Sequence, residues 1–271
     1  MSEHDIPWWT PQVGQNEYAN LRDVLESNYL NDGDVTTQFE QEIAKLVGAT
    51  YAVGVTNGTS ALFLSLAALG IGHGDEVVVP DLTFIATANA VTLTGATPVL
   101  VDIDPATFNI DADKIEAAVT NRTRAILPVS LYGQCSDMDT INAIALRHNL
   151  TVIEDAAQAF GARLGRHEVG TMGDAAAFSF FPTKNLGGYG DGGAVVLDSE
   201  DRASLVRALR SHGRGAKAYY SSYVGYNARL DALQAALLRV KLAHVDEANS
   251  CRRDLAKQYH GLIQGESRQL R

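Results

Sequence analysis

The sequence predicts an α/β fold in which helices cover both faces of a mainly parallel sheet. Short apolar runs alternate along the chain with segments whose apolar residues recur at helical spacing. The runs are continuously apolar, which is typical of strands buried on both faces. Apolar residues make up 46% of the 271 residues, enough for a sizeable core. These observations favour strands connected by helices over a bundle or a sandwich.

Two helices are expected before the alternation begins, over residues 14–28 and 36–47. Leu30–Gly33 forms a turn between them, and Gly48 ends the second. The elements that follow are expected in the order strand 51–55, helix 59–69, strand 76–79, helix 84–93, strand 97–101, helix 111–119, strand 124–129, helix 137–148 and strand 151–154. In such a sheet, ligands bind at the carboxyl ends of the strands.

The last third of the chain departs from the regular alternation. Residues 176–180 and 193–197 are expected to pair like a hairpin around a functional loop, and the chain beyond Leu230 is expected to be helical almost to its end. We predict a large domain over residues 1–235, with an N-terminal helical arm. Residues 236–271 are predicted to form connecting helices that lead to a truncated C-terminal domain.

Composition excludes several classes of function. A formal charge of −10 argues against nucleic acid or an anionic membrane surface as the main partner. Cys135 and Cys251 lie far apart without CxxC spacing, so neither a disulfide nor a metal site is expected. No apolar run approaches the roughly 20 residues that cross a bilayer, and no signal-peptide pattern is present. We expect a cytoplasmic protein.

A phosphate-binding turn is predicted after the strand at 51–55. The following residues include Gly58, Thr59 and Ser60 and open a helix, whose first N–H groups and dipole favour an anion. The hydroxyls of Thr59 and Ser60 are further donors. Considered alone, these residues are better explained as an ordinary helix N-cap.

Asp155 is predicted to lie at the carboxyl end of the strand at 151–154. A buried aspartate needs a cationic partner, and a protonated pyridine nitrogen is one. Gln158 follows at helical spacing and is placed to reach a ring hydroxyl. The alternative is that Asp155 is the N-cap of a following helix.

Lys184 occupies a loop that contains Pro182 and several glycines. A lysine that forms a Schiff base must lose enough hydration to supply a neutral amine. This apolar, glycine-rich loop favours that role over a solvated surface lysine. Ser179, five residues earlier, is a further candidate phosphate ligand.

Three more candidates follow predicted strands or precede the last helices. Phe84 is placed to stack on a pyridine ring, although a core phenylalanine is the alternative. Asn227 is a candidate phosphate ligand. Arg229 is placed to pair with a substrate carboxylate or phosphate, or else with Asp231 in a salt bridge.

Four motifs identify a family resemblance. GTSAL at 58–62, IEDAAQ at 153–158, FFPTKNLG at 180–187 and GYNARLD at 225–231 closely resemble the DegT/DnrJ/EryC1/StrS family. These are fold-type I pyridoxal-phosphate enzymes that mostly transaminate keto sugars attached to nucleotides. The resemblance covers nearly the whole chain and implies a seven-stranded large domain.

The resemblance implies a role for each residue at the ring of pyridoxal phosphate. Lys184 would hold the cofactor as a Schiff base and move the proton at the substrate carbon. Asp155 would pair with the pyridine nitrogen, Gln158 would contact the ring hydroxyl, and Phe84 would stack on the ring. The branch of sugar dehydratases that has histidine in place of the lysine is disfavoured because Lys184 is present.

The resemblance also implies how the phosphate is bound and how subunits assemble. Thr59, Ser60 and Ser179 would bind the phosphate, and Asn227 would reach it from the neighbouring subunit. A homodimer with composite active sites is therefore implied. Members usually continue into a smaller C-terminal domain that completes the sugar site, whereas this sequence ends at Arg271.

The expected function is amino transfer from an amino acid, L-glutamate in the first instance, to a nucleotide-linked keto sugar, with no metal. Two alternatives share the cofactor: amino transfer to a free cyclic ketone such as an inosose, and binding of the cofactor without turnover. A generic nucleotide-binding α/β domain is a third, but it leaves the lysine loop unexplained.

Overall fold

The structure is a computed structural model that describes residues 7, 9–215 and 219–263. Its centre is a seven-stranded sheet. The strands lie in the order β1 (Tyr51–Val55), β9 (Gly193–Leu197), β8 (Ala175–Ser179), β5 (Thr151–Asp155), β4 (Thr123–Ile126), β2 (Glu76–Pro80) and β3 (Thr97–Val101). Strand β9 is antiparallel to both of its neighbours, and the other hydrogen-bonded pairs are parallel. The predicted fold class is confirmed.

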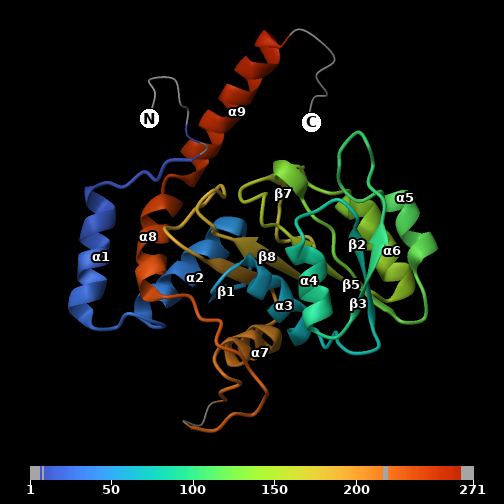
Figure 1. The fold of residues 1–271 in the computed structure, drawn as a ribbon, viewed down its shortest axis with the longest axis horizontal. Coiled ribbons are helices and arrows are strands. Elements are labelled where there is room, and N and C mark those ends of the chain that lie inside the picture. Colours follow the sequence, from blue (N-terminus) through green and yellow to red (C-terminus); the bar gives the residue numbers. More distant parts are fainter. Residues whose placement is uncertain (1–6, 8, 216–218, 264–271) are drawn as a thin grey trace.

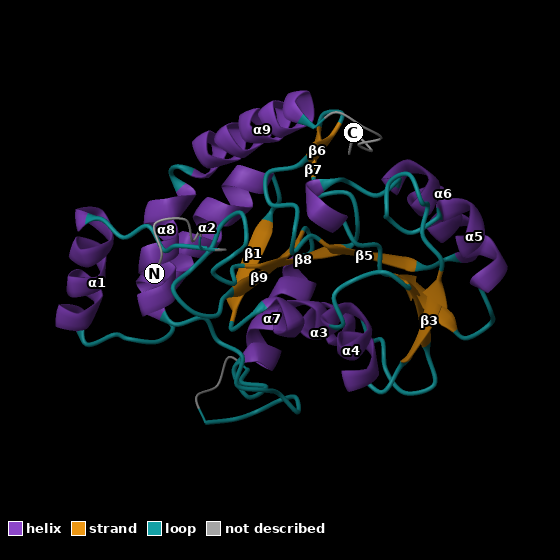
Figure 2. Ribbon diagram, turned by 45° about the horizontal axis from the view of Figure 1, so that its top comes forward, coloured by secondary structure: helices purple, strands orange, loops and turns teal. Residues whose placement is uncertain are grey.

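Helices cover both faces of this sheet, as Figure 2 shows with the sheet seen nearly edge-on. One face is covered by α3 (Gly58–Ala68), α4 (Ala86–Leu93) and α7 (Glu200–Arg210). The other is covered by α2 (Asp34–Val47), α5 (Ala112–Ile115), α6 (Met138–His148) and α8 (Ala232–Leu242). Because side chains alternate across a strand, Ala177 of β8 packs on the face covered by α3, α4 and α7, and Phe178 packs on the face covered by α2 and α8.

Two helices lie at the periphery of these layers (Figure 1). Helix α1 (Gln15–Ser27) packs its buried Val24 against Ala232 and Ala236 of α8. Helix α9 (Val245–Leu262) extends away from the body of the molecule. None of the helices among the described residues is long and apolar enough to span a bilayer.

The structure differs from the sequence-based expectations in a few elements. The strand expected over 124–129 ends at Ile126, two residues before Pro128, which has no N–H to donate. The helix expected over 111–119 is α5 followed by a 3₁₀ turn, η1 (Glu116–Ala118). Helix α7 and the two-residue strands β6 (Arg163–Leu164) and β7 (His167–Glu168) were not predicted.

The division into domains remains a prediction. The predicted boundary between residues 235 and 236 falls inside α8. The ends of the two predicted domains, residues 1–6 and 264–271, lie outside the described residues.

Candidate functional site

The predicted site residues lie at the carboxyl ends of three strands, β5, β8 and β1, of which β5 and β8 are neighbours and β9 separates β8 from β1. Asp155 is the last residue of β5, Ser179 is the last of β8, and Lys184 lies in the loop that leads from β8 to β9. Helix α3 begins at Gly58, just beyond the end of β1. Strand order therefore brings together residues that are more than a hundred positions apart in the sequence.

Asp155 is a buried carboxylate, with 5% of the residue exposed. Its Oδ2 accepts a hydrogen bond from the Thr87 hydroxyl at 2.8 Å, and its Oδ1 accepts from the Ala157 N–H at 3.1 Å. Burial raises the pKa of Asp155, and both hydrogen bonds and the charge of Lys184 oppose that shift. Both hydrogen-bond donors to the carboxylate are uncharged, and one lysine is nearby. The negative charge of Asp155 can therefore also stabilise a second cation.

The segment after Asp155 is a turn rather than the helix that the sequence suggested. The Asp155 side chain bonds the N–H two residues ahead, which is the geometry of an Asx turn, and small residues follow it. Gln158 is half-buried in this turn, and its Oε1 accepts from the backbone N–H of Tyr132 at 3.1 Å. The predicted contact between Gln158 and a ring hydroxyl remains a prediction.

Lys184 is a half-buried side chain and not a fully solvated one. Its backbone N–H bonds the Phe181 carbonyl at 2.8 Å, which closes the turn after Pro182. Burial lowers the pKa of Lys184, and the charge of Asp155 opposes that shift. The lysine therefore has a larger neutral fraction at a given pH than an exposed lysine has.

This pKa shift predicts how the Lys184 amine reacts with pH. The rate at which an aldehyde attaches to Lys184 should rise with pH and level off at a lower pH than for an exposed lysine, because only the neutral amine reacts. Asp155→Asn should move this profile to still lower pH, since the Asp155 charge raises the pKa of Lys184. The measurement is the attachment rate of pyridoxal phosphate to the cofactor-free chain over a range of pH. A midpoint that moves upward in Asp155→Asn would contradict the assignment.

The start of α3 has free donors next to β8. The Asn57 side chain caps the helix by accepting from the Ser60 N–H at 2.8 Å, and the first intrahelical bond runs from Ala61 N–H to the Asn57 carbonyl at 3.0 Å. Asn57, rather than Thr59 or Ser60, is thus the N-cap. The N–H groups of Gly58 and Thr59 precede the first intrahelical bond and point out of the helix end.

Gly58 allows α3 to approach β8 at this point. A Cβ atom on Gly58 would lie 2.7 Å from the Cβ of Ser179, closer than real Cβ atoms come. The contact places the Ser179 side chain beside the start of α3, where Thr59 and Ser60 lie half-buried in the first turn. Three of the four predicted phosphate ligands are therefore grouped together.

Gly58→Ala is expected to destabilise the fold by about 1–3 kcal/mol, the usual cost of overpacking a closely packed position. Ser179→Gly in the same chain should recover part of that loss, because it removes the atom with which the new Cβ collides. Gly72→Ala is the control, since its nearest neighbour is a carbonyl oxygen at 3.4 Å. The check is urea unfolding of the four chains, and equal stability of Gly58→Ala and Gly72→Ala would refute the close approach.

The remaining predicted site residues are Phe84 and those in the segment around Asn227. The Phe84 ring is 67% exposed just before α4, so it is not a core residue. The Ala228 carbonyl accepts from Thr56 N–H at 3.0 Å, which places this segment beside the end of β1, and Asn227 is exposed. Arg229 donates to the Ser211 hydroxyl at 3.2 Å. The salt bridge with Asp231 is not among the ion pairs of the residues that the structure describes.

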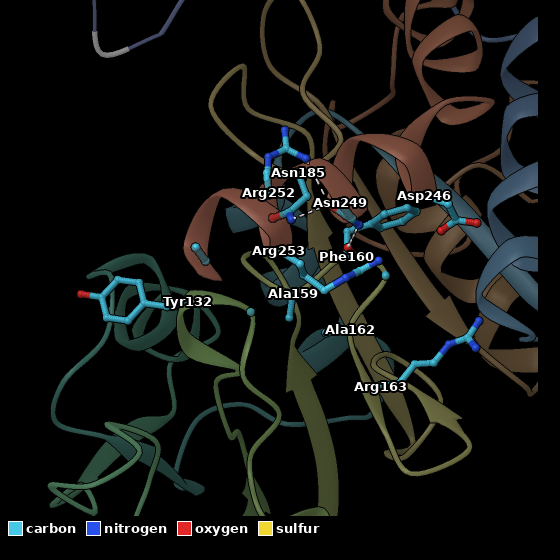
Figure 3. Close-up of a pocket in the computed structure, with 13 residues that line it drawn as sticks. Tyr132, Ala159, Phe160, Ala162, Arg163, Asn185, Asp246, Asn249, Arg252 and Arg253 are labelled. Atoms are coloured by element: carbon cyan, nitrogen blue, oxygen red, sulfur yellow. Dashed lines mark hydrogen bonds between the residues drawn. The ribbon is translucent and has the colours of Figure 1, made fainter. Parts of the chain in front are cut away.

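A cavity of about 790 Å³ opens between α9 and the segment after β5 (Figure 3). Asn185, Asn249, Arg252 and Arg253 are among the residues that line it. Lys184 and Asp155 are not, so this cavity lies beside the predicted site and not at it. Asn249 forms a hydrogen bond to Asn185, the residue after Lys184.

Sequence reasoning missed Thr87, Asn57 and Asn249. Asn57 directly precedes the expected helix, so the preference for asparagine at N-caps was a usable signal. Thr87 lies 68 positions from Asp155 in the chain and contacts it only in the folded protein. Asn249 looks like an ordinary polar residue on an exposed helix.

Relatives and solved structures agree on one family. The sequence matches the DegT/DnrJ/EryC1/StrS aminotransferase family over residues 11–270. It is 49% identical to the "Pleiotropic regulatory protein" of Geobacillus stearothermophilus, over 90% of this chain and 65% of the relative. It is 46% identical to the UDP-2-acetamido-2-deoxy-3-oxo-D-glucuronate aminotransferase of Pseudomonas aeruginosa, over 89% of this chain and 67% of that protein.

Solved structures have the same fold. DesV of S. venezuelae, in complex with a ketimine intermediate, superposes with a TM-score of 0.90 at 46% identity, over 93% of this chain and 67% of that one. Spr1654 of Streptococcus pneumoniae in its PLP form superposes with a TM-score of 0.91 at 27% identity, over 95% and 71%. The chain spans roughly two thirds of the length of these proteins. This chain belongs to the DegT/DnrJ/EryC1/StrS aminotransferase family.

Proposed function

We propose that this chain binds pyridoxal phosphate through Lys184 and transfers an amino group from L-glutamate to a keto group of a nucleotide-linked sugar. The observation that carries the proposal is the placement of a half-buried lysine and a buried aspartate beyond the carboxyl ends of the neighbouring strands β8 and β5, near enough for each to affect the charge of the other. Burial disfavours the charge on each of them, and each partly restores the charge of the other. Such an arrangement is typical of a site that uses its lysine chemically.

The residues present fit the cofactor. The Asp155 carboxylate is buried beside uncharged donors, which suits a protonated ring nitrogen. The start of α3 and Ser179 suit a phosphate, because free N–H groups and hydroxyls gather there. When bound, pyridoxal phosphate supplies an aldehyde that condenses with amines and a ring that accepts the electrons released at the substrate carbon.

Lys184 and Asp155 have distinct tasks in this proposal. Lys184 would hold the cofactor through its neutral Nζ, and with an amine substrate bound in its place the same Nζ would move the proton at the substrate carbon. Asp155 stabilises positive charge on the ring nitrogen throughout. Gln158 donates its amide N–H to the ring hydroxyl, and Thr87 keeps the Asp155 carboxylate in place through the 2.8 Å bond.

The other predicted residues bind the rest of the cofactor and the substrate. Thr59, Ser60 and Ser179 bind the phosphate, and Phe84 stacks on the ring. Arg229 binds an anionic group of the substrate. Its guanidinium has one described hydrogen bond, to an uncharged hydroxyl, which leaves donors for such a group.

A homodimer completes the site in this proposal, with Asn227 of each subunit reaching the phosphate of the other. Large exposed side chains occur beside Phe84 and in the loop before Asn227: Phe84, Ile85, Tyr219 and Val224 are all more than 60% exposed. Light scattering of the purified chain should give twice the mass of 29.1 kDa, and a monomer would contradict the composite site. Cys135 and Cys251 are both free thiols, which fits a cytoplasmic location.

Relatives support a nucleotide-linked sugar as the amino acceptor. They include the glucuronate aminotransferase above and a dTDP-3-amino-3,6-dideoxy-alpha-D-galactopyranose transaminase of Aneurinibacillus thermoaerophilus, 49% identical to this chain. A free cyclic acceptor is the second candidate. It is favoured by the likeness to 3-amino-5-hydroxybenzoic acid synthase, with a TM-score of 0.85 at 38% identity.

Isotope transfer separates the two candidates. The chain is incubated with pyridoxal phosphate, ¹⁵N-labelled L-glutamate and either a UDP-linked or dTDP-linked 3-keto sugar or an inosose, and products are identified by mass spectrometry. We expect labelled amino sugar in the reactions with a nucleotide-linked sugar and no label in the reaction with the inosose. Label in the aminated inosose alone would favour the second candidate. If no acceptor gains label although glutamate is converted to its keto acid, the amino-acid half-reaction stands and both acceptor assignments fall.

A further inference from the structure

Asn249 is an unusual residue on α9. Only Val245 and Asn249 are buried on this 18-residue helix, and the asparagine is 6% exposed. Burying an amide without hydrogen bonds is costly, whereas an apolar residue at this position would pack at no such cost. A buried asparagine on an otherwise exposed helix therefore suggests a role beyond packing.

The Asn249 amide makes three hydrogen bonds. Its Nδ2 donates to the Phe160 carbonyl at 3.0 Å, and its Oδ1 accepts from Arg252 Nη1 at 3.1 Å and from Asn185 Nδ2 at 2.9 Å (Figure 3). The orientation of this amide is determined by its neighbours, because a carbonyl can only accept and an arginine can only donate. Asn249 thus links the segment after β5 to the loop that contains Lys184.

The backbone around Asn249 is shaped to admit this amide. Gly161 has φ of +82°, and a Cβ atom there would lie 2.7 Å from Asn249 Nδ2. Glycine adopts this conformation without the strain that other residues incur. The segment after Asp155 therefore accommodates the Asn249 side chain closely.

Helix α8 holds the next residues of the same loop. Lys241 Nζ donates to the Gly187 carbonyl at 2.8 Å, and Gln234 Oε1 accepts from Tyr189 N–H at 3.1 Å. Together with Asn185, alternate residues of the loop are attached to α9 and α8. The anchor at Asn185 is the one next to Lys184.

We propose that Asn249 is a positioning residue that fixes Lys184 through the side chain of Asn185. The inference rests on the proposed function, since it concerns the lysine that binds the cofactor. Lys184 is held in its turn by its own N–H bond to Phe181 and, one residue later, by the Asn185–Asn249 bond. Loss of the second bond allows the loop to move and the lysine amine to leave the position from which it attacks the aldehyde.

The test compares two ligands that differ in their bond to Lys184. Pyridoxal phosphate attaches covalently, which a visible absorbance change reports, whereas pyridoxamine phosphate binds the same site without that bond. In Asn249→Ala the attachment rate should fall about tenfold or more, because misplacement of a reacting group by about 1 Å costs up to about 100-fold. The dissociation constant of pyridoxamine phosphate should change by less than about threefold, a shift of well under 1.4 kcal/mol.

Four further variants separate positioning from a general loss of structure. Asn185→Ala should slow attachment as much as Asn249→Ala does, and the double variant should be no slower than either single one. Asn249→Asp keeps the acceptor for Asn185 but loses the donor to the Phe160 carbonyl, so it should attach faster than Asn249→Ala and slower than the wild type. Arg252→Ala is the matched control, since it removes the other donor to the same oxygen from the same helix.

The outcomes distinguish the two proposals. If Asn249→Ala attaches the cofactor as fast as the wild-type chain does, the positioning role is overturned and the proposed function stands. Equal losses of attachment rate and pyridoxamine phosphate affinity in Asn249→Ala, with Asn249→Asp equally impaired, also overturn it. A wild-type chain without any Lys184-dependent attachment overturns the proposed function and this inference with it.

Discussion

Asp155→Asn is expected to lower the rate of amino transfer by about 100- to 1,000-fold, the usual cost of removing one buried electrostatic contact to the reacting system. Asparagine has nearly the same shape, its single oxygen can still accept from the Ala157 N–H, and its amide N–H can donate to the Thr87 hydroxyl oxygen, so the turn should survive. It carries no charge to stabilise a protonated ring nitrogen. The measurement is the rate constant for conversion of L-glutamate in single-turnover experiments.

The control for this variant is Asp102→Asn, which removes an exposed carboxylate paired with Lys114. Both variants change the net charge equally, but Asp102 directly follows β3, an edge strand of the sheet, and not β5. Wild-type rates are expected for it. An Asp155→Asn chain that reacts within about threefold of wild type would remove Asp155 from the proposed electrostatic role.

Arg210→Met is expected to lower the free energy of unfolding by about 3 kcal/mol, because it removes the close, buried ionic partner of the Glu40 carboxylate and leaves only Arg207, at 4.0 Å. Arg210 at the end of α7 is 6% exposed and donates to the Glu40 carboxylate and the Gly54 carbonyl. Glu40 on α2 is also 6% exposed, and it accepts from Gly54 N–H at 2.8 Å. The pair therefore joins helices on opposite faces of the sheet to β1.

Urea unfolding measures this effect, and two further variants test its cause. Arg147→Met removes one side of an exposed pair with Glu116 and should leave stability nearly unchanged. Adding Glu40→Gln to Arg210→Met should recover part of the loss, since no buried charge then remains unpaired. If Arg210→Met is no less stable than Arg147→Met, the ion pair is not what connects these elements.

Most of the sheet could be predicted because its strands are apolar on both sides. The runs at 51–55 and 151–154 are buried on each face, so their hydrophobicity was visible without knowledge of their neighbours. The order of strands was not, because hydrogen-bonded neighbours such as β1 and β9 are more than 130 residues apart. Helix α7 was missed because its sequence is strongly polar and only one side is buried.

The candidate site could be predicted where chemistry and position coincide. Lys184 and Asp155 are ionisable residues beside apolar strands, a combination that is visible in one sequence. Gln158 was placed on a helix that does not form, because the Asp155 side chain bonds the next turn instead. Thr87 and Asn249 act through contacts that tertiary folding alone creates, so no local pattern indicates them.

The visible spectrum of the purified chain with pyridoxal phosphate, before and after addition of L-glutamate, tests the central proposal most directly. We expect a visible band that Lys184→Ala does not show and that glutamate removes as the cofactor accepts the amino group. A Lys184-dependent band that glutamate leaves unchanged would reduce the proposal to cofactor binding without turnover. Identical spectra for wild type and Lys184→Ala, in preparations that circular dichroism shows to be folded, would contradict it.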